Sequence, residues 1–201
     1  MTVLMAALLA AASAAPSEPA NGVDERPRRG TFVETSLGVF TSMGGSASVS
    51  NGQAYLGMTV GREVGEQAAV FASLGIGATS ASCYQHNPRG DNLPCLAADS
   101  FGATFLEGGA SYGFQVGRRM LLSLKVVAGF TDLSPGPVTS SSGNVPDHVP
   151  GFHFGGGASF DYDTHLDHFG VGIDTLLRYT IARYGLTLPS LAVMPRIRYV
   201  F

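Results

Sequence analysis

The stretch from Asp161 to His168 holds more potential metal ligands than any other eight residues of the chain. Its sequence, DYDTHLDH, contains three Asp and two His. Carboxylate and imidazole groups bind divalent cations when several of them converge on one point. The alternative is a solvated turn flanked by the ends of two strands. We favour the turn, and we expect neither a metal site nor a cofactor.

Serine and histidine are the next candidates for chemistry. A lipid-modifying enzyme would need a Ser–His pair or an equivalent nucleophile and base. Ser140–Ser142 form a polar run, but no recognisable motif places them beside His148 or His153, which we assign to the surface or to strand ends. The Gly-rich run at 155–159 lies inside a predicted strand and lacks the following helix of a phosphate-binding loop. We therefore expect no catalytic residues and no enzyme.

Two cysteines, Cys83 and Cys95, bracket a polar segment that contains Pro88, Gly90 and Pro94. In an exported protein such a pair is typical of a disulfide that closes a loop. The alternative is a metal or redox pair, which lacks the support of a CxxC motif or clustered His. The sequence therefore predicts a loop disulfide.

The elements that carry these residues follow from a period-2 alternation that starts at residue 31, because successive side chains of a strand point to opposite faces. One face of each segment is apolar and the other is rich in Gly. The alternation predicts eight strands, at about 31–42, 53–63, 67–79, 101–116, 120–131, 151–162, 168–181 and 190–201. Short connections (64–66, 117–119, 163–167) alternate with longer ones (43–52, 80–100, 132–150, 182–189), as in outer-membrane barrels.

Composition narrows the fold class. The chain has 45% hydrophobic and 13% charged residues, 27 Gly among 201 residues and a net charge of −3. The absence of a basic block excludes nucleic acid as a partner. We predict an all-β chain that forms a single eight-stranded antiparallel transmembrane β-barrel of the OmpA/OmpX size, located in the bacterial outer membrane with its long loops at the cell surface. The alternative is a soluble sandwich or lipocalin-like barrel, in which the apolar face would point inward.

Eight charged residues fall on the Gly-rich faces. The interior of an eight-stranded barrel is only wide enough for side chains, and buried charges must pair. We therefore expect a closed, ion-paired lumen, centred on Arg178, Arg196 and Asp174, and the alternative is a narrow selective channel or proton path. The predicted network contains four acids and four bases, Glu34, Glu107, Asp161, Asp174, Lys125, Arg178, Arg196 and Arg198.

The sequence predicts an export signal at the N-terminus and an assembly signal at the C-terminus. Residues 1–14 contain a short apolar stretch and the small-x-small site Ala12-Ser13-Ala14, which predict a signal peptide, although no Lys or Arg precedes it. An N-terminal helix of the mature protein is the alternative. The Pro-rich and charged residues 15–30 predict a disordered periplasmic lead, and 31–201 form the barrel. The alternating end of the chain, with Ile197, Tyr199 and Phe201, resembles the C-terminal signal that the barrel-assembly machinery recognises.

Several stretches of the sequence resemble those of one protein family. They are FVETSLGVFTSMGG, the Cys-bearing second long connection, LKVVAGFTDLSPGPV, DHFGVGIDTLLRYTI and LAVMPRIRYVF. Together they resemble the CglE-like outer-membrane proteins of myxobacteria, named for adventurous gliding motility. The resemblance implies a non-catalytic surface component of the gliding machinery, whose outer loops or periplasmic lead contact other motility proteins. The alternative function is a generic small barrel, embedded in outer-membrane lipid, with structural or adhesive loops; a narrow channel or a lipid-modifying enzyme is less favoured.

Overall fold

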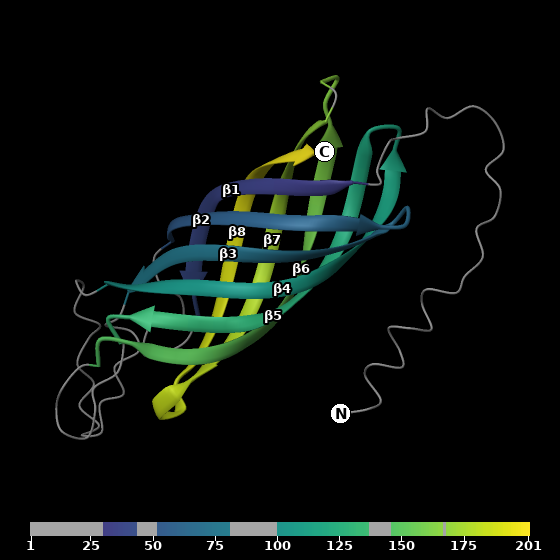
Figure 1. Ribbon diagram of the computed structural model, residues 1–201. Coiled ribbons are helices and arrows are strands. Elements are labelled where there is room, and N and C mark those ends of the chain that lie inside the picture. The colour runs from purple at the N-terminus through teal and green to yellow at the C-terminus, as the bar shows by residue number, and fades with distance from the viewer. Residues whose placement is uncertain (1–29, 44–51, 81–99, 137–145, 167) are drawn as a thin grey trace, which may run out of the picture.

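A computed structural model describes residues 30–43, 52–80, 100–136, 146–166 and 168–201. These residues form eight strands and one short 3-10 turn (Figure 1). The elements are β1 (Thr31–Ser42), β2 (Gln53–Val64), β3 (Ala68–Ser80), β4 (Ser100–Gly117), β5 (Met120–Ser134), β6 (Val149–Asp163), β7 (Phe169–Ala182), η2 (Arg183–Gly185) and β8 (Thr187–Val200). Within these residues, no helix has the length and apolarity needed to cross a membrane.

The strands close into one barrel in chain order, and each strand runs antiparallel to its neighbours. The closing seam pairs β1 with β8, from Phe32 opposite Val200 to Ser42 opposite Ser190. Closure removes the unpaired edges of a sheet, so the backbone polar groups of the strands can pair within the barrel. The predicted fold class is confirmed, and every predicted strand boundary lies within three residues of the observed one.

The last connection is shorter than predicted. Residues 182–189 were expected to form a long loop, but η2 turns the chain within four residues, with Tyr184 and Gly185 at φ of 62° and 70°. β8 therefore begins at Thr187 and includes Pro189, opposite Tyr179 of β7. Proline is usually excluded from the interior of a sheet because it has no N–H to donate. Here its carbonyl oxygen still accepts a hydrogen bond from the Met43 N–H, at 2.7 Å.

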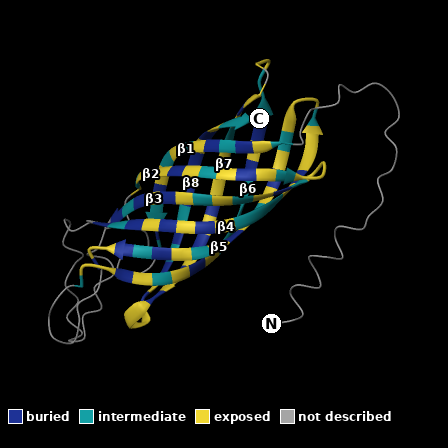
Figure 2. Cartoon of the chain, in the orientation of Figure 1, coloured by how far each residue is buried: buried dark blue, intermediate teal, exposed yellow. Residues whose placement is uncertain are grey.

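Exposed and buried residues alternate along the strands (Figure 2), and most of the large exposed side chains on the outer face are apolar. Aromatic pairs lie towards both ends of this face: Phe130 with Phe152 on the side of the long loops, and Tyr112 with Phe114 on the side of the short turns. Such aromatic girdles mark the two interfaces of a membrane. The exposed apolar side chains between them include Leu56, Met58, Val70, Leu74, Leu106, Leu124, Val126, Ile173 and Leu177. A soluble barrel would have the opposite arrangement, so that alternative is wrong.

Candidate functional site

The lumen is the best candidate for a site, because it gathers nearly all the buried polar residues. Its contents form three layers along the barrel axis. The turn-side cluster lies nearest the short turns and comprises Glu34, Lys125, Asp161, Asp174, Arg196 and Arg198. The central cluster comprises Tyr55, Ser73, Glu107, His153 and Arg178. The loop-side core is apolar and includes Phe40, Phe101, Ala103, Phe105, Leu133, Val149 and Leu188.

Glu34 of β1 is the hub of the turn-side cluster. Its Oε1 accepts hydrogen bonds from Arg196 Nη1 and from Arg198 Nε, the latter at 2.6 Å. Lys125 Nζ lies 4.0 Å from its other oxygen. The pair with Arg198 follows from register, since Glu34 and Arg198 stand opposite each other across the closing seam. One buried carboxylate is therefore surrounded by three cations from β5 and β8.

Two aspartates balance these cations. Lys125 Nζ donates to Asp174 Oδ2 at 2.7 Å, and Arg196 Nη2 donates to Asp161 Oδ1 at 2.5 Å. Arg196 Nε also lies 3.1 Å from Asp174 Oδ1, but neither atom has a hydrogen-bond partner among the described residues, so this contact is an ion pair with poor hydrogen-bond alignment. Arg196 thus contacts three carboxylates, those of Glu34, Asp161 and Asp174.

The turn-side cluster extends to a residue that the sequence reading missed. Arg198 Nη1 lies 3.6 Å from Glu63 Oε1 at the end of β2, and its guanidinium stacks 4.4 Å from the ring centroid of Phe32. Glu63 has the same parity as Tyr55, Thr59 and Gly61, so the period-2 pattern could have identified it. Glu63 is the last residue of the predicted strand and was therefore not assigned to the lumen.

Arg178 and Glu107 form the central cluster. Arg178 donates from Nε to Glu107 Oε2 and from Nη2 to Glu107 Oε1, both at 2.9 Å. Ser73 Oγ donates to the same carboxylate at 2.9 Å, and His153 Nε2 lies 3.0 Å from it. The two-point geometry is the strong form of an Arg–carboxylate pair. With four contacts, Glu107 is a fully satisfied buried anion.

Two aromatic rings lie next to the Arg178 guanidinium. Its guanidinium carbon lies 5.3 Å from the ring centroid of Tyr55 and 4.7 Å from that of Phe105. Its Nη2 also donates to the Tyr55 hydroxyl at 2.8 Å. Contacts of this kind are worth more when water is excluded, and Arg178 is only 2% exposed. The cation is therefore fixed in position at the boundary with the loop-side core.

The prediction of one centre formed by Arg178, Arg196 and Asp174 is wrong. Arg196 contacts Asp174, but in the part of the chain that the structure describes no ion pair joins Arg178 to Asp174. Both residues face the lumen from β7, where Asp174 lies nearer the short turns. Arg178 instead pairs with Glu107 of β4. Sequence parity assigns residues to the lumen, but it does not reveal contacts that cross it.

His153 was assigned to the surface or to a strand end, and this is also wrong. Its side chain is buried in the lumen, with Nδ1 2.7 Å from Thr131 Oγ1 and Nε2 facing Glu107. A hydroxyl, an imidazole and a carboxylate in this order resemble a catalytic relay. Here the hydroxyl and the imidazole are each 2% exposed, and Arg178 already holds the carboxylate. We therefore interpret this row of hydrogen-bonded side chains, from Thr131 through His153 to Glu107, as structural and not catalytic. His148 is exposed, as expected, and lies 2.7 Å from Asp132 Oδ2.

The loop-side core had no counterpart in the sequence reading, which expected a Gly-rich polar lumen throughout. Phe40, Tyr55 and Phe105 pack with ring centroids 5.7 to 6.4 Å apart, and Leu133 and Val149 are completely buried nearby. In these parts of the strands apolar side chains face inward, as at Phe105, which is buried beside the exposed Thr104. An apolar residue there therefore does not mark the lipid-facing side of the strand. Apolar packing therefore closes the lumen at the end of the barrel that carries the long loops.

The other predicted residues are placed as follows. Asp161 bonds to Arg196, whereas His168 Nδ1 lies 2.8 Å from the Val200 carbonyl oxygen, so these two residues of the 161–168 run have different partners. Within the described ranges, no group of three or more His, Cys, Asp or Glu could hold a metal ion.

Some predictions concern residues that lie outside the described ranges. They are the disulfide between Cys83 and Cys95, the signal peptide at 1–14 and nearly all of the lead at 15–30. The disulfide therefore stays a prediction.

The residues of the predicted C-terminal signal lie on the outer face. Ile197 is exposed, and Tyr199 packs against Phe169 and Phe201, both with ring centroids 4.9 Å away. The Phe201 N–H donates to the Thr31 carbonyl oxygen at 2.9 Å, beside the closing seam. The segment is therefore an ordered part of the aromatic girdle at the short turns.

No protein-family model and no curated protein sequence matches the chain. Solved structures do match its fold. Neisserial surface protein A (NspA) has a TM-score of 0.60 and 12% identity, over 85% of this chain and 97% of that one. Ail, the attachment invasion locus protein of Yersinia pestis, solved with the heparin analogue sucrose octasulfate, has a TM-score of 0.50 and 13% identity, over 85% and 99%. At this identity the likeness concerns the fold alone.

The apolar outer face, the closed antiparallel sheet and this shared fold lead to one conclusion. The chain is a bacterial outer-membrane β-barrel. The short turns of such barrels face the periplasm and the longer loops face the outside. In this outer-membrane barrel the loop-side core therefore lies towards the cell surface, and the turn-side cluster lies towards the periplasm.

Proposed function

We propose that this barrel is a closed, non-conducting element of the outer membrane that supports the envelope and presents its loops at the cell surface. The filled lumen carries the proposal. Two ion-paired layers and one apolar layer follow each other along the axis, and the cavity between the two charged layers measures about 30 Å³. Such a volume suits about two water molecules and not a hydrated ion in transit.

The chemistry of the outer loops narrows the class of surface they would contact. The connections at 43–52, 81–99, 135–148 and 183–186 contain two basic residues, Arg89 and Arg183, against Asp91, Asp99 and Asp147. A polyanion such as the sulfated ligand in the Ail structure would need a basic surface. The loops are instead rich in Ser, Gly, Asn and Pro, so we propose contacts with uncharged surfaces through hydrogen bonds.

Conductance in a planar bilayer tests the closed lumen. We expect the purified, refolded barrel to insert without stepwise current, while a large porin in the same lipid gives open channels. Insertion is checked separately by the heat-dependent gel migration of the recovered protein. Reproducible current steps from inserted protein would contradict the closed lumen and would favour the narrow-channel alternative.

A deletion strain separates support of the envelope from adhesion. If the barrel has a structural role, loss of the gene should increase sensitivity to detergent, and a version in which residues 81–99 are replaced by a Gly/Ser linker should restore resistance. If the loops are adhesive, the same version should fail to restore attachment to a surface. Unchanged sensitivity and unchanged attachment in the deletion strain would exclude both roles.

A role in gliding motility is a second proposal, which rests on the resemblance of the strand stretches quoted above. In it the loops or the periplasmic lead would contact motility proteins, and the C-terminal strand would be bound by the barrel-assembly machinery during insertion. Filming isolated cells of the deletion strain on a firm surface tests the motility role. Loss of single-cell gliding, restored by the gene, would support it, and normal gliding would exclude it.

A further inference from the structure

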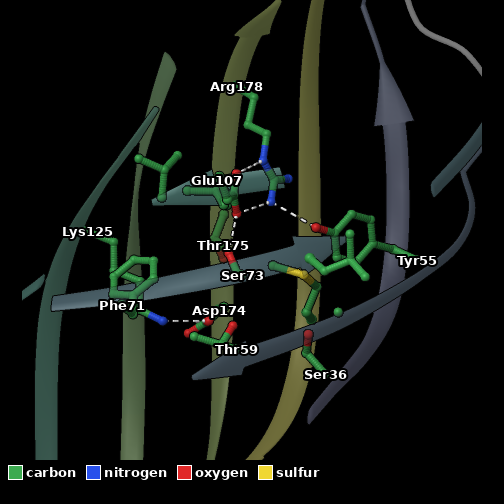
Figure 3. A pocket seen from close by; sticks show the side chains of 15 residues that line it. Ser36, Tyr55, Thr59, Phe71, Ser73, Glu107, Lys125, Asp174, Thr175 and Arg178 are labelled. Carbon is green, nitrogen blue, oxygen red and sulfur yellow. Dashed lines mark hydrogen bonds and ion pairs between the residues drawn. The ribbon is translucent and has the colours of Figure 1, made fainter. Parts of the chain in front are cut away.

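The cavity in the middle of the lumen separates the two charged clusters. It has a volume of about 30 Å³, and its walls come from seven of the eight strands. Figure 3 shows Arg178, Glu107 and Tyr55 on one side of it and Lys125 and Asp174 on the other. Ser36 of β1 and Thr59 of β2 complete the polar part of the wall. A polar cavity of this kind inside a packed barrel needs a physical explanation.

The polar groups around the cavity have unused hydrogen-bonding capacity. Within the described part of the chain, neither the Ser36 hydroxyl nor the Thr59 hydroxyl has a hydrogen-bond partner in the protein. The Lys125 ammonium has three N–H donors, of which one is used by Asp174. The Tyr55 hydroxyl accepts a bond from Arg178, which leaves its own proton to donate. Four polar groups from β1, β2 and β5 therefore have bonds to make.

The charges of the wall argue against an ion as the occupant. Lys125 and Arg178 supply two positive charges, and Asp174 and Glu107 supply two negative ones. Each of these charges is already paired across the lumen, at 2.7 Å for Lys125 with Asp174 and 2.9 Å for Arg178 with Glu107. The cavity therefore has no net charge that would attract an anion or a cation. Water, which both donates and accepts, matches the mixture of groups.

We propose that this cavity is a built water site, which holds about two ordered waters bonded to Ser36, Thr59, Tyr55 and Lys125. Through these waters the central cluster and the turn-side cluster form one hydrogen-bonded network. Because water-mediated bonds are nearly as favourable as direct ones, the network rigidifies the middle of the lumen without further packing. Ser36 and Thr59 are the residues that specify the site, since they make no other hydrogen bond there.

A crystal structure at a resolution that shows ordered water tests the site directly. We expect two solvent peaks at hydrogen-bond distance from Ser36 Oγ and Thr59 Oγ1, in the full-length barrel purified in detergent. A map without them, in which other lumen waters are visible, would overturn the proposal. So would an anomalous peak in the cavity after a bromide soak, because it would show an anion instead of water.

Two matched variants give a second readout. Thr59→Val keeps the shape of the side chain but removes the hydroxyl, whereas Thr35→Val makes the same change on the lipid-facing side of β1, where Thr35 is exposed. We expect Thr59→Val to lower the midpoint of urea unfolding and to remove a solvent peak, and Thr35→Val to do neither. A midpoint that rises with Thr59→Val would indicate a dry cavity and would overturn the proposal. Neither readout depends on whether the barrel conducts.

Discussion

Arg178 is the residue whose surroundings are most demanding. It needs the two-point fork that Glu107 accepts and a flat group that lies against the rings of Tyr55 and Phe105. Arginine has both properties, and lysine has neither. The pair lies deep in the lumen, with both side chains at most 4% exposed. Its main energetic role is therefore to keep Glu107 from being a buried, uncompensated charge.

A double-substitution cycle tests this role. Arg178→Met removes the cation and should lower the free energy of unfolding by about 3–5 kcal/mol, because a buried carboxylate is left unpaired. Adding Glu107→Gln removes that charge and should recover part of the loss. Urea unfolding followed by circular dichroism or tyrosine fluorescence measures both, since the chain has no Trp. If the double variant loses the sum of the two single effects, pairing of these charges is not what stabilises the cluster.

At the scale of the strands, aromatic residues on one strand cover glycines on the next. Tyr55 of β2 lies over Gly75 of β3, and a Cβ added at Gly75 would collide with the Tyr55 hydroxyl. Phe71 lies over Gly109 in the same way. Because the lumen is narrow, a ring can occupy it only where the neighbouring strand has no side chain. The high Gly content of the inner faces therefore reflects the space that the lumen aromatics require.

A pair of Gly→Ala variants tests this packing. Gly75→Ala should destabilise the barrel by about 1–3 kcal/mol, the usual cost of overpacking a close-packed interior. Gly108→Ala is the control, because Gly108 faces outward and an added Cβ there would lie 3.8 Å from the nearest atom, the Phe71 carbonyl oxygen. Unfolding midpoints in detergent or lipid compare the two. Equal midpoints would show that the Tyr55 ring can shift to make room for the added methyl group without loss of stability.

The sequence predicts the strands well because most lipid-facing positions are apolar. Lys125 and Asp174, for example, are placed on the inner face by parity alone, and the structure brings their charges within 2.7 Å. Their partners could not be predicted, since contacts between β5 and β7 depend on how the sheet closes. The loop-side core was missed for another reason. Phe101 and Leu188 face inward beside Gly102 and Thr187, so the apolar residues of the alternation do not mark the lipid-facing side there.

At the scale of the whole molecule, the barrel presents an apolar band bounded by two aromatic girdles. On β5 and β6 the band runs from Leu122 opposite Phe160 to Phe130 opposite Phe152. Val126 lies midway between these pairs, on the outer face, with 61% of its surface exposed. Met120 lies beyond the Leu122–Phe160 pair, on the side of the short turns, opposite Tyr162. The arrangement assigns Val126 to the midplane of the membrane and Met120 to its periplasmic interface.

The cost of a charge at these two positions tests the assigned depth. In a barrel that spans a membrane, Val126→Arg should lower the free energy of unfolding by about 2–4 kcal/mol, because the guanidinium would face hydrocarbon at the midplane. Met120→Arg should cost about 0–1 kcal/mol, since its charge would reach the headgroups. Reversible unfolding from lipid vesicles measures both, and refolding into detergent micelles, where a charge on the surface is more easily solvated, should reduce the difference. Equal costs in vesicles would mean that the band around β5 is not centred in the bilayer, and a larger cost at Met120 would shift the whole barrel towards the periplasm.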